Sequence, residues 1–143
     1  MIDENTKIIC HVVMDDSVIK NEWDRIFTST IDDKIKKKIN FEENRWHMFS
    51  NHIIEAIEGD AARECFNRSL KEKIYESYKD RDKNKLYAFY QDEYDVYEIE
   101  LNEDLEASYF DLEWDIYIYD PENRWTYINT HERDWFGPYY YGL

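Results

Sequence analysis

The sequence predicts a single α+β domain over residues 1–143, in which N-terminal helices pack on a mainly antiparallel sheet of about four to five strands from the C-terminal half. Before residue 84 the apolar residues recur at the three- and four-residue spacing of helices, and after it they alternate as in strands. Strands and helices do not alternate regularly along the chain, which argues against a parallel sheet. The chain has three Gly, two Pro and no Ser/Gly-rich or Pro-rich linker, so no internal domain boundary is expected.

The first predicted elements are a strand and two helices. The β-branched run from Ile8 to Val13 is typical of a strand. In the first helix the apolar residues lie at i, i+4, i+7 and i+8, and in the second they repeat every four residues, so each helix carries one apolar stripe. The stripes are Ile19, Trp23, Ile26 and Phe27, then Ile31, Ile35 and Ile39, and lysines at 34, 36, 37 and 38 fill the opposite face of the second helix.

Two further helices are expected before residue 80. Ser50 is a suitable N-cap for a short helix that ends before Gly59 and buries three isoleucines, Ile53, Ile54 and Ile57. Asp60 is a suitable N-cap for the next helix, whose apolar face is formed by Ala62, Cys65, Phe66, Leu70 and Ile74. The charged run from Lys79 to Lys85 that follows is interpreted as an exposed connection.

Strands dominate the rest of the chain. The nearly continuous apolar run Leu86 to Tyr90 and the alternating run Asp95 to Leu101 each predict a strand. The segment Asn102 to Phe110 is expected to form a short helix, because its first carboxylates are well placed for the positive end of a helix dipole.

The strongest pair of strands follows. Asp115 to Tyr119 and Arg124 to Thr130 are joined by Asp120-Pro121-Glu122-Asn123, which suits a type I turn. We therefore expect a hairpin at this position. The aromatic tail Tyr139 to Tyr141 is expected to cover the sheet, because three consecutive aromatic residues in water would form an unusual apolar patch.

Composition excludes several classes of protein. With 33 acidic and 18 basic residues the formal net charge is −15, which argues against ordinary nucleic-acid binding. Hydrophobic residues at 43% are too abundant for a disordered acidic tail. No stretch approaches the roughly 20 apolar residues that cross a bilayer, and the acidic segment Met1 to Asn5 does not resemble a signal peptide. We expect a soluble cytoplasmic protein in which Cys10 and Cys65 are free core thiols.

The negative charge is concentrated in the second half of the chain. Residues 72–143 hold 19 acidic and 7 basic residues, a net charge of −12, whereas residues 1–71 hold 14 and 11, a net charge of −3. Between Asp92 and Glu122 there are 13 acidic residues and no Lys or Arg, interleaved with Tyr, Trp and Phe. Clustered carboxylates attract a cationic partner, and Tyr and Trp are enriched at the centres of protein interfaces.

We therefore expect a partner-binding surface in this region. Carboxylates would face Lys or Arg of the partner, and aromatic side chains would anchor it. The candidate residues are Asp92, Glu93, Tyr94, Asp95, Glu98, Glu100, Asp111, Glu113, Trp114, Asp115 and Tyr117. The other interpretation is that the aromatic residues form the sheet core and the acidic residues only keep the protein soluble.

Enzymatic and metal-binding alternatives depend on His47, His131 and Glu132. Two imidazoles and a carboxylate could bind a metal or act as general acid and base, if they converge in space. No His-Glu-x-x-His motif, Gly-x-Ser-x-Gly elbow or glycine-rich phosphate loop supports this interpretation, and no cofactor is expected. A third possibility is a structural subunit that associates with itself through an apolar patch.

Several segments together resemble a known family. They are Trp46-His47-Met48-Phe49-Ser50, Glu58-Gly59-Asp60-Ala61-Ala62, Tyr87-Ala88-Phe89-Tyr90-Gln91, Asp115-Ile116-Tyr117-Ile118, Trp125-Thr126-Tyr127-Ile128-Asn129-Thr130-His131-Glu132 and Gly137-Pro138-Tyr139. The chain resembles the bacterial family Domain of Unknown Function 4275 over most of residues 41–141. It departs from the family pattern through extra polar residues around 74–85 and through Trp135 and Phe136 before Gly137. The resemblance implies a soluble protein of Bacillus-like bacteria with no assigned activity.

The sequence thus favours a protein-binding module. Its most concrete form is an immunity- or antitoxin-like inhibitor that captures a basic protein, such as a nuclease toxin, through the acidic and aromatic strand region. Small acidic proteins suit this task because enzymes that act on nucleic acid have positive sites. The hypothesis requires the carboxylates of the second half to lie together on one surface.

Overall fold

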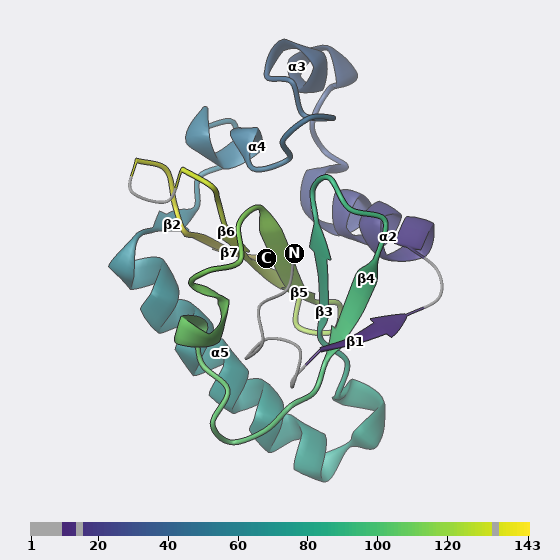
Figure 1. The fold of residues 1–143 in the computed structure, drawn as a ribbon. Coiled ribbons are helices and arrows are strands. Elements are labelled where there is room, and N and C mark those ends of the chain that lie inside the picture. Colours follow the sequence, from purple (N-terminus) through teal and green to yellow (C-terminus); the bar gives the residue numbers. More distant parts are fainter. Residues whose placement is uncertain (1–9, 14–15, 133–134) are drawn as a thin grey trace.

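The structure, a computed structural model, describes residues 10–13, 16–132 and 135–143 and places an antiparallel sheet between two layers of helix (Figure 1). The helices are α2 (Asp16–Thr28), α3 (Asp33–Lys38), α4 (His47–Ser50) and α5 (Asp60–Lys79), with the 3₁₀ turns η1 (Arg81–Lys83) and η2 (Ala107–Phe110). The strands are β1 (Cys10–Val13), β2 (Ile57–Glu58), β3 (Tyr87–Tyr90), β4 (Val96–Ile99), β5 (Ile116–Asp120), β6 (Trp125–Asn129) and β7 (Tyr139–Gly142).

The α+β class and the antiparallel sheet are confirmed. The strand order is β1-β4-β3-β5-β6-β7-β2, and all the pairs are antiparallel. The described residues form a seven-stranded sheet, which is larger than the predicted four to five strands. The five strands β3 to β7 come from the C-terminal half, and β1 and the two-residue β2 from the N-terminal half extend the sheet at its two edges.

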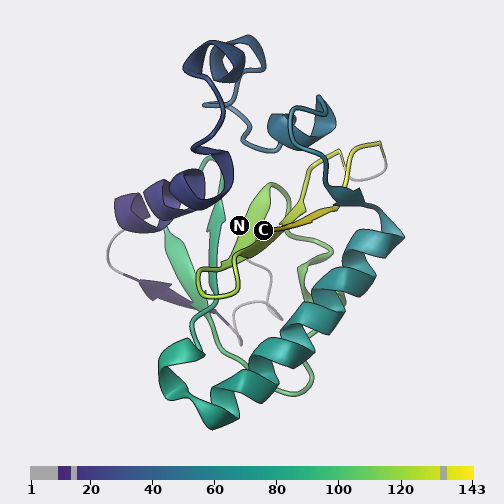
Figure 2. The same cartoon turned by 180° about the vertical axis from the view of Figure 1, so that it is seen from behind.

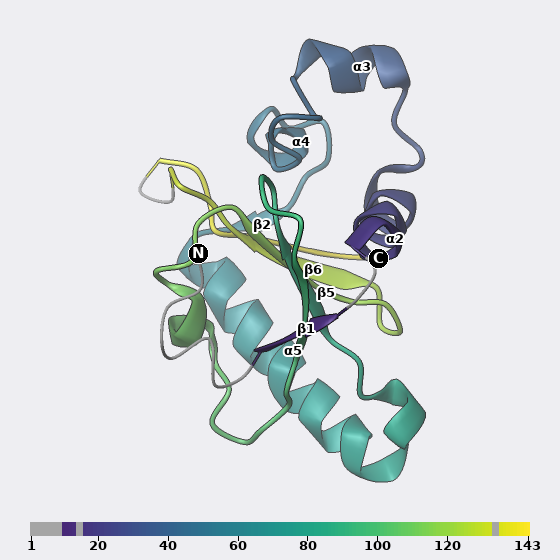
Figure 3. The ribbon, with the colours of Figure 1, turned by 45° about the vertical axis from the view of Figure 1, so that its right-hand side comes forward.

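Both faces of the sheet are covered. Figure 2 and Figure 3 show α5 lying across one face, with α2 beyond the other. Successive residues of β5 alternate between the two cores: Ile116 and Ile118 pack with α5, whereas Tyr117 and Tyr119 pack with α2 and the segment around α4. All residues of β5 and β6 are buried, so the aromatic residues of this hairpin are core.

The helix α5 forms where its apolar spacing predicts it. Ala62, Phe66 and Leu70 are fully buried on its inner face, as the three- and four-residue period requires. The N-cap position is occupied by Gly59, one residue before the predicted Asp60, and its φ of 72° lies in the region that glycine adopts without steric cost. Cys65 is a free, half-buried thiol on this helix. In the described segments, no helix has the length and apolar character needed to span a membrane.

Several predicted elements differ from the structure. The short helix expected between Ser50 and Gly59 is wrong: α4 ends at Ser50, and Ile57 and Glu58 instead pair with β7. Helical spacing cannot reveal a strand whose partner lies about 80 residues later in the chain. The helix expected over 102–110 is reduced to the turn η2, and residues 8 and 9 of the first predicted strand lie outside the described residues.

A buried ion pair joins α5 to the hairpin turn. The Nζ atom of Lys73 donates to Oδ1 of Asp120 at 2.9 Å, and both side chains are fully buried. The same Oδ1 accepts the backbone N–H groups of Glu122 and Asn123 at 2.9 and 3.1 Å. Asp120 therefore holds the turn and compensates the buried charge of Lys73.

Replacing Lys73 by Met is expected to lower the free energy of unfolding by about 3–5 kcal/mol, because the Asp120 carboxylate then remains buried without its cation. The matched control is Lys85→Met, which removes a partly exposed pair with Glu98 and should cost no more than about 1 kcal/mol. Urea unfolding of both variants at neutral pH measures the difference. Equal losses in the two variants would contradict the assigned role of the Lys73–Asp120 pair.

Candidate functional site at one end of the sheet

Three connections leave the central strands at the same end. In the register, Tyr90 at the end of β3 lies opposite Ile116 at the start of β5, and Ile116 lies opposite Asn129 at the end of β6. The connections 91–95, 111–115 and 130–138 therefore meet along one end of the sheet, the upper end in Figure 1. Residues 133–134 of the third connection lie outside the described residues.

Large apolar side chains protrude from all three connections. The exposed fractions are 86% for Tyr94, 73% for Leu112, 59% for Trp114, 83% for Trp135 and 40% for Phe136. We call these five residues, together with the exposed Asp92 and Asp95, the loop surface. Single exposed apolar residues are common, but several at one end of a small protein are typical of an interaction site.

The connection 111–115 alternates between inward carboxylates and outward apolar side chains. Asp111 pairs with Arg63 at the start of α5, and Glu113 accepts a hydrogen bond from the hydroxyl of Tyr90 at 2.7 Å. Leu112 and Trp114, the residues next to Glu113, are exposed. The carboxylates of this connection therefore anchor it to the domain and direct its apolar residues outward.

Two residues from the end of β6 hold the same connection. The Nδ2 group of Asn129 donates to the carbonyl oxygens of Phe110 and Glu113, each at 3.0 Å. Asp115 accepts from the backbone N–H of His131 at 3.0 Å, and its Oδ2 lies 2.8 Å from Nδ1 of the same histidine. Asp115 has a φ of 56°, so its backbone is held in the left-handed region where these contacts compensate the steric cost.

The buried amide of Gln91 joins the connections to the N-terminal half. Its Oε1 accepts from the backbone N–H of Arg45 at 2.8 Å and from the hydroxyl of Tyr117 at 2.6 Å. Its Nε2 donates to the carbonyl of Glu42 at 3.2 Å, and its backbone N–H donates to the carbonyl of Asp115 at 3.0 Å. One side chain thus links the segment 42–45, the end of β3 and the start of β5.

Two of the candidate contact residues prove to be internal. Tyr117 is fully buried and Glu113 is 1% exposed, so neither can touch a partner on this surface. The Tyr117 hydroxyl also accepts from the backbone N–H of Trp46 at 3.0 Å, and burial raises the pKa of Tyr117 well above its ordinary value. The phenol therefore stays neutral and acts as a structural donor and acceptor.

Asp111 and Asp115 are paired with Arg63 and His131, and the other candidates divide between the two ends of the sheet. Asp92, Tyr94, Asp95 and Trp114 lie on the loop surface and are exposed, and the half-buried Glu93 accepts at its carbonyl from Lys20. Glu98 and Glu100 lie toward the opposite end, because β4 runs away from the connection 91–95. There Glu98 pairs with Lys85 at 2.7 Å, and both glutamates line a separate hollow of about 570 Å³. The expected single acidic surface is therefore smaller than the sequence suggested.

The histidines of the enzymatic alternative lie around one tryptophan. The ring centroids of His47 and His131 are 4.6 and 5.8 Å from that of Trp46. The Nδ1 atom of His47 lies 2.6 Å from the carbonyl oxygen of Ile39, and Nδ1 of His131 is engaged by Asp115. Within the described ranges, no group of three or more His, Cys, Asp or Glu side chains could hold a metal ion.

The carboxylate that orients His131 is Asp115 and not the adjacent Glu132. The Glu132 side chain is exposed, and its carbonyl accepts from the backbone N–H of Trp135 at 2.8 Å. Sequence reasoning missed the Asp115–His131 contact, although the predicted hairpin contained a signal for it. Counting outward from the turn through the observed register places residue 115 opposite residue 130, next to His131.

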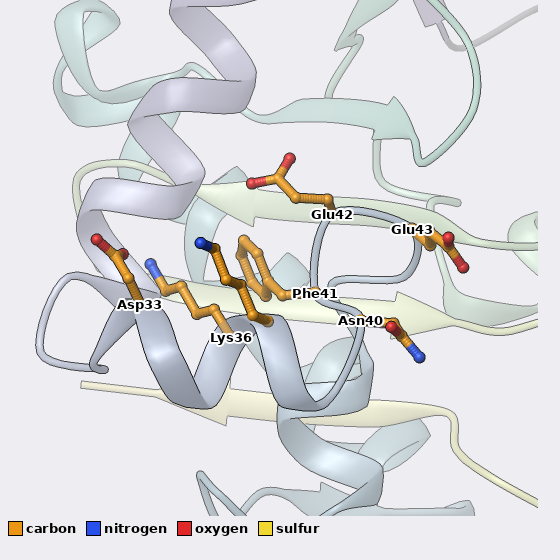
Figure 4. Close-up of a pocket in the computed structure, with 7 residues that line it drawn as sticks. Asp33, Lys36, Asn40, Phe41, Glu42 and Glu43 are labelled. Atoms are coloured by element: carbon orange, nitrogen blue, oxygen red, sulfur yellow. The ribbon is translucent and has the colours of Figure 1, made fainter.

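A second hollow lies between α3 and the turn that follows it. It has a volume of about 270 Å³, and Figure 4 shows Lys36 extending from α3 beside Phe41, while Asn40 and Glu43 point away. The Lys36 ammonium lies 4.9 Å from the centroid of the buried Phe41 ring. Charges of both signs line this hollow, which is not arranged like a catalytic centre.

Comparison with known proteins identifies the family. The family model described as "Domain of unknown function (DUF4275)" matches residues 1–140, so the chain belongs to this family and the resemblance seen in the sequence is confirmed. No curated protein and no solved structure matches the chain. The family description assigns no activity, so the function has to be argued from the site.

Replacing Gln91 by Met is expected to lower the free energy of unfolding by about 2 kcal/mol, because the buried Tyr117 hydroxyl and the Arg45 N–H lose their common acceptor. Hydrogen exchange at the Arg45 amide should accelerate at the same time. The control Asp92→Asn, one residue away and exposed, should change stability by no more than about 0.5 kcal/mol. Unchanged exchange at Arg45 in the Gln91 variant would refute the proposed link.

Proposed function

We propose that this member of the DUF4275 family is a protein-binding module that captures a basic protein through the loop surface. In its most concrete form it is an immunity- or antitoxin-like inhibitor of a cationic enzyme, such as a nuclease toxin, and it acts in the cytoplasm. The observation that carries the proposal is the group of five large apolar side chains exposed at the end of the sheet that also exposes Asp92 and Asp95.

The apolar residues supply the free energy of binding. Burying one fully exposed side chain of this size is worth about 1.5–3 kcal/mol, and Trp and Tyr are the residues most enriched at hot spots. Trp114 and Tyr94 combine an apolar ring with a polar group that can still reach water or a partner. Such side chains suit a binding surface that is exposed to water before the partner binds.

The carboxylates determine the sign of the partner. Within the described residues, Asp92 and Asp95 make no hydrogen bond or ion pair, and the whole chain carries a net charge of −15. Such a field attracts a cationic protein and accelerates its association, most strongly at low ionic strength. A negatively charged partner would be repelled over the same distances.

The internal contacts prepare the surface for binding. Asp111, Glu113 and Asp115 are each held by another side chain, so the connection 111–115 is ordered before a partner arrives. Pre-ordering lowers the entropic cost of association, which for flexible loops reduces affinity. These three carboxylates were expected to contact the partner, and we propose instead that they position the exposed Leu112 and Trp114.

The binding role is better supported than the enzymatic one. The Asp115–His131 pair has the geometry of an oriented imidazole, but in the described part of the chain His131 is hydrogen-bonded only to Asp115. Nucleophilic catalysis needs a hydroxyl or thiol within hydrogen-bond distance of the base. The same pair is well explained by its role in holding the connection 111–115.

Photo-crosslinking from position 114 is expected to capture one basic protein. The experiment replaces Trp114 by p-benzoylphenylalanine in the cell that naturally makes the chain, with Tyr75, 60% exposed on α5, as the matched position. With the captured protein purified, Trp114→Ala should weaken binding by about tenfold or more, whereas Tyr75→Ala should change it by less than about twofold. The proposal fails if positions 114 and 75 capture the same proteins.

The double variant Asp92→Asn with Asp95→Asn is expected to slow association with the captured protein at about 50 mM salt and to have little effect at about 500 mM. Glu64→Gln with Glu72→Gln is the control, because it changes the net charge equally at exposed positions of α5. Stopped-flow mixing measures both rates. If the control pair slows association as much as the Asp pair, the loop surface does not direct the encounter.

A further inference from the structure

The helix α3 stands apart from the domain that carries it. It buries none of its own residues, and Figure 3 shows it projecting beyond α4, away from the sheet. It is nevertheless a regular helix, because the Asp32 carboxylate accepts from the backbone N–H of Lys34 at 2.8 Å and caps its first turn. We call α3, residues 33–38, the α3 arm. Core packing does not explain why the chain forms it.

The α3 arm has the opposite charge to the rest of the chain. It contains Lys34, Lys36, Lys37 and Lys38 with the single acid Asp33, a net charge of +3 in a protein of −15. The helix dipole favours cations only in the last turn, so it accounts for the last three lysines and not for Lys34 in the first turn. In the described ranges, Lys34, Lys37 and Lys38 have no acidic partner.

The α3 arm is tied to the loop surface. The chain leaves α3 through Ile39 and Phe41, both buried in the core beside α2. It then reaches Glu42 and Arg45, which are hydrogen-bonded to the Gln91 amide at the start of the connection 91–95. A cationic arm and an acidic connection thus lie at the same end of the molecule with a direct link between them.

We propose that the α3 arm is a second contact for the same protein partner and receives an acidic segment of it. This inference rests on the proposed function. The partner then carries two patches of opposite sign, a basic patch opposite Asp92 and Asp95 and an acidic patch opposite the α3 lysines. It also carries an apolar region that receives Trp114. A uniformly basic protein would be repelled by the α3 arm, so the arm selects among cationic proteins.

The hollow beside the α3 arm does not by itself select an acidic side chain. It has a volume of about 270 Å³, and Lys36 and Lys37 of α3 are among the residues that line it. The buried Phe41 also lines it. Because Asp33, Glu42 and Glu43 also line the hollow, its own charge does not favour a carboxylate. The acidic segment of the partner is therefore expected at the exposed lysines of the α3 arm, Lys34, Lys37 and Lys38.

Crosslinking with a zero-length carbodiimide detects this contact directly, because the reagent joins Lys amines only to carboxylates that touch them. The probe is the full chain mixed with the basic protein captured from position 114. Isopeptide bonds between the lysines at 34, 36, 37 or 38 and Asp or Glu of that protein are expected. No such bond, with crosslinking from position 114 intact, overturns this inference and leaves the proposed function standing.

The matched variants are Lys34→Glu on the α3 arm and Lys71→Glu, an exposed residue of α5. Both change the net charge equally, and a Glu in the first turn is favoured by the helix dipole, so Lys34→Glu preserves α3. Lys34→Glu is expected to weaken binding about threefold or more relative to Lys71→Glu, and an Asp-to-Lys change at the crosslinked partner site should restore it.

Three results overturn the inference. Equal affinities of Lys34→Glu and Lys71→Glu mean that the α3 arm is only a solvated helix. Isopeptide bonds between α3 lysines and Asp92 or Asp95 of a second copy mean that the arm mediates self-association. Loss of a nuclease-sensitive complex in Lys34→Glu means that the lysines bind nucleic acid. Failure to capture any protein from position 114 refutes the proposed function instead.

Discussion

The arrangement of the candidate site depends on the buried amide of Gln91. Only an amide can serve here, because its oxygen accepts from two donors, the Arg45 N–H and the Tyr117 hydroxyl, while its nitrogen donates to the Glu42 carbonyl. A carboxylate has no N–H to donate to that carbonyl. An apolar residue would leave the Arg45 N–H and the Glu42 carbonyl without this partner, and the Tyr117 hydroxyl without its acceptor. This contact joins the segment 42–45, the strand β5 and the connection 91–95.

The fold was predictable where the signal is local. The hairpin of β5 and β6 was found because Pro121 and its polar neighbours mark the turn, and α5 because its apolar spacing continues from Ala62 to Ile74. The segment after Ser50 was not, because Ile57 and Glu58 belong to a strand whose partner is β7. An isoleucine-rich segment fits a helix or a strand equally well until the pairing strand is known.

The site was predictable in position but not in the roles of its residues. Composition identified the acidic and aromatic connections 91–95 and 111–115. The register of β3, β5 and β6 shows that they lie at the same end of the sheet. Composition could not reveal that the Glu113 side chain points inward. That direction is set by hydrogen bonds from Tyr90 of β3 and from Asn129 at the end of β6. A connection of five residues is too short for its alternation of inward and outward side chains to be predicted from a sequence period.

The distribution of charge shows why a net charge of −12 over residues 72–143 overstates the acidity of the loop surface. Asp120 is compensated by Lys73, Asp111 by Arg63 and Glu98 by Lys85, and these pairs lie in three different parts of the fold. The field that a partner meets at this end is set by the few carboxylates left outside such pairs and by the lysines of α3 beside them. Recognition therefore depends on which charges the fold leaves unpaired at that end, and the apolar residues of the loop surface determine how tightly a correctly oriented partner is held.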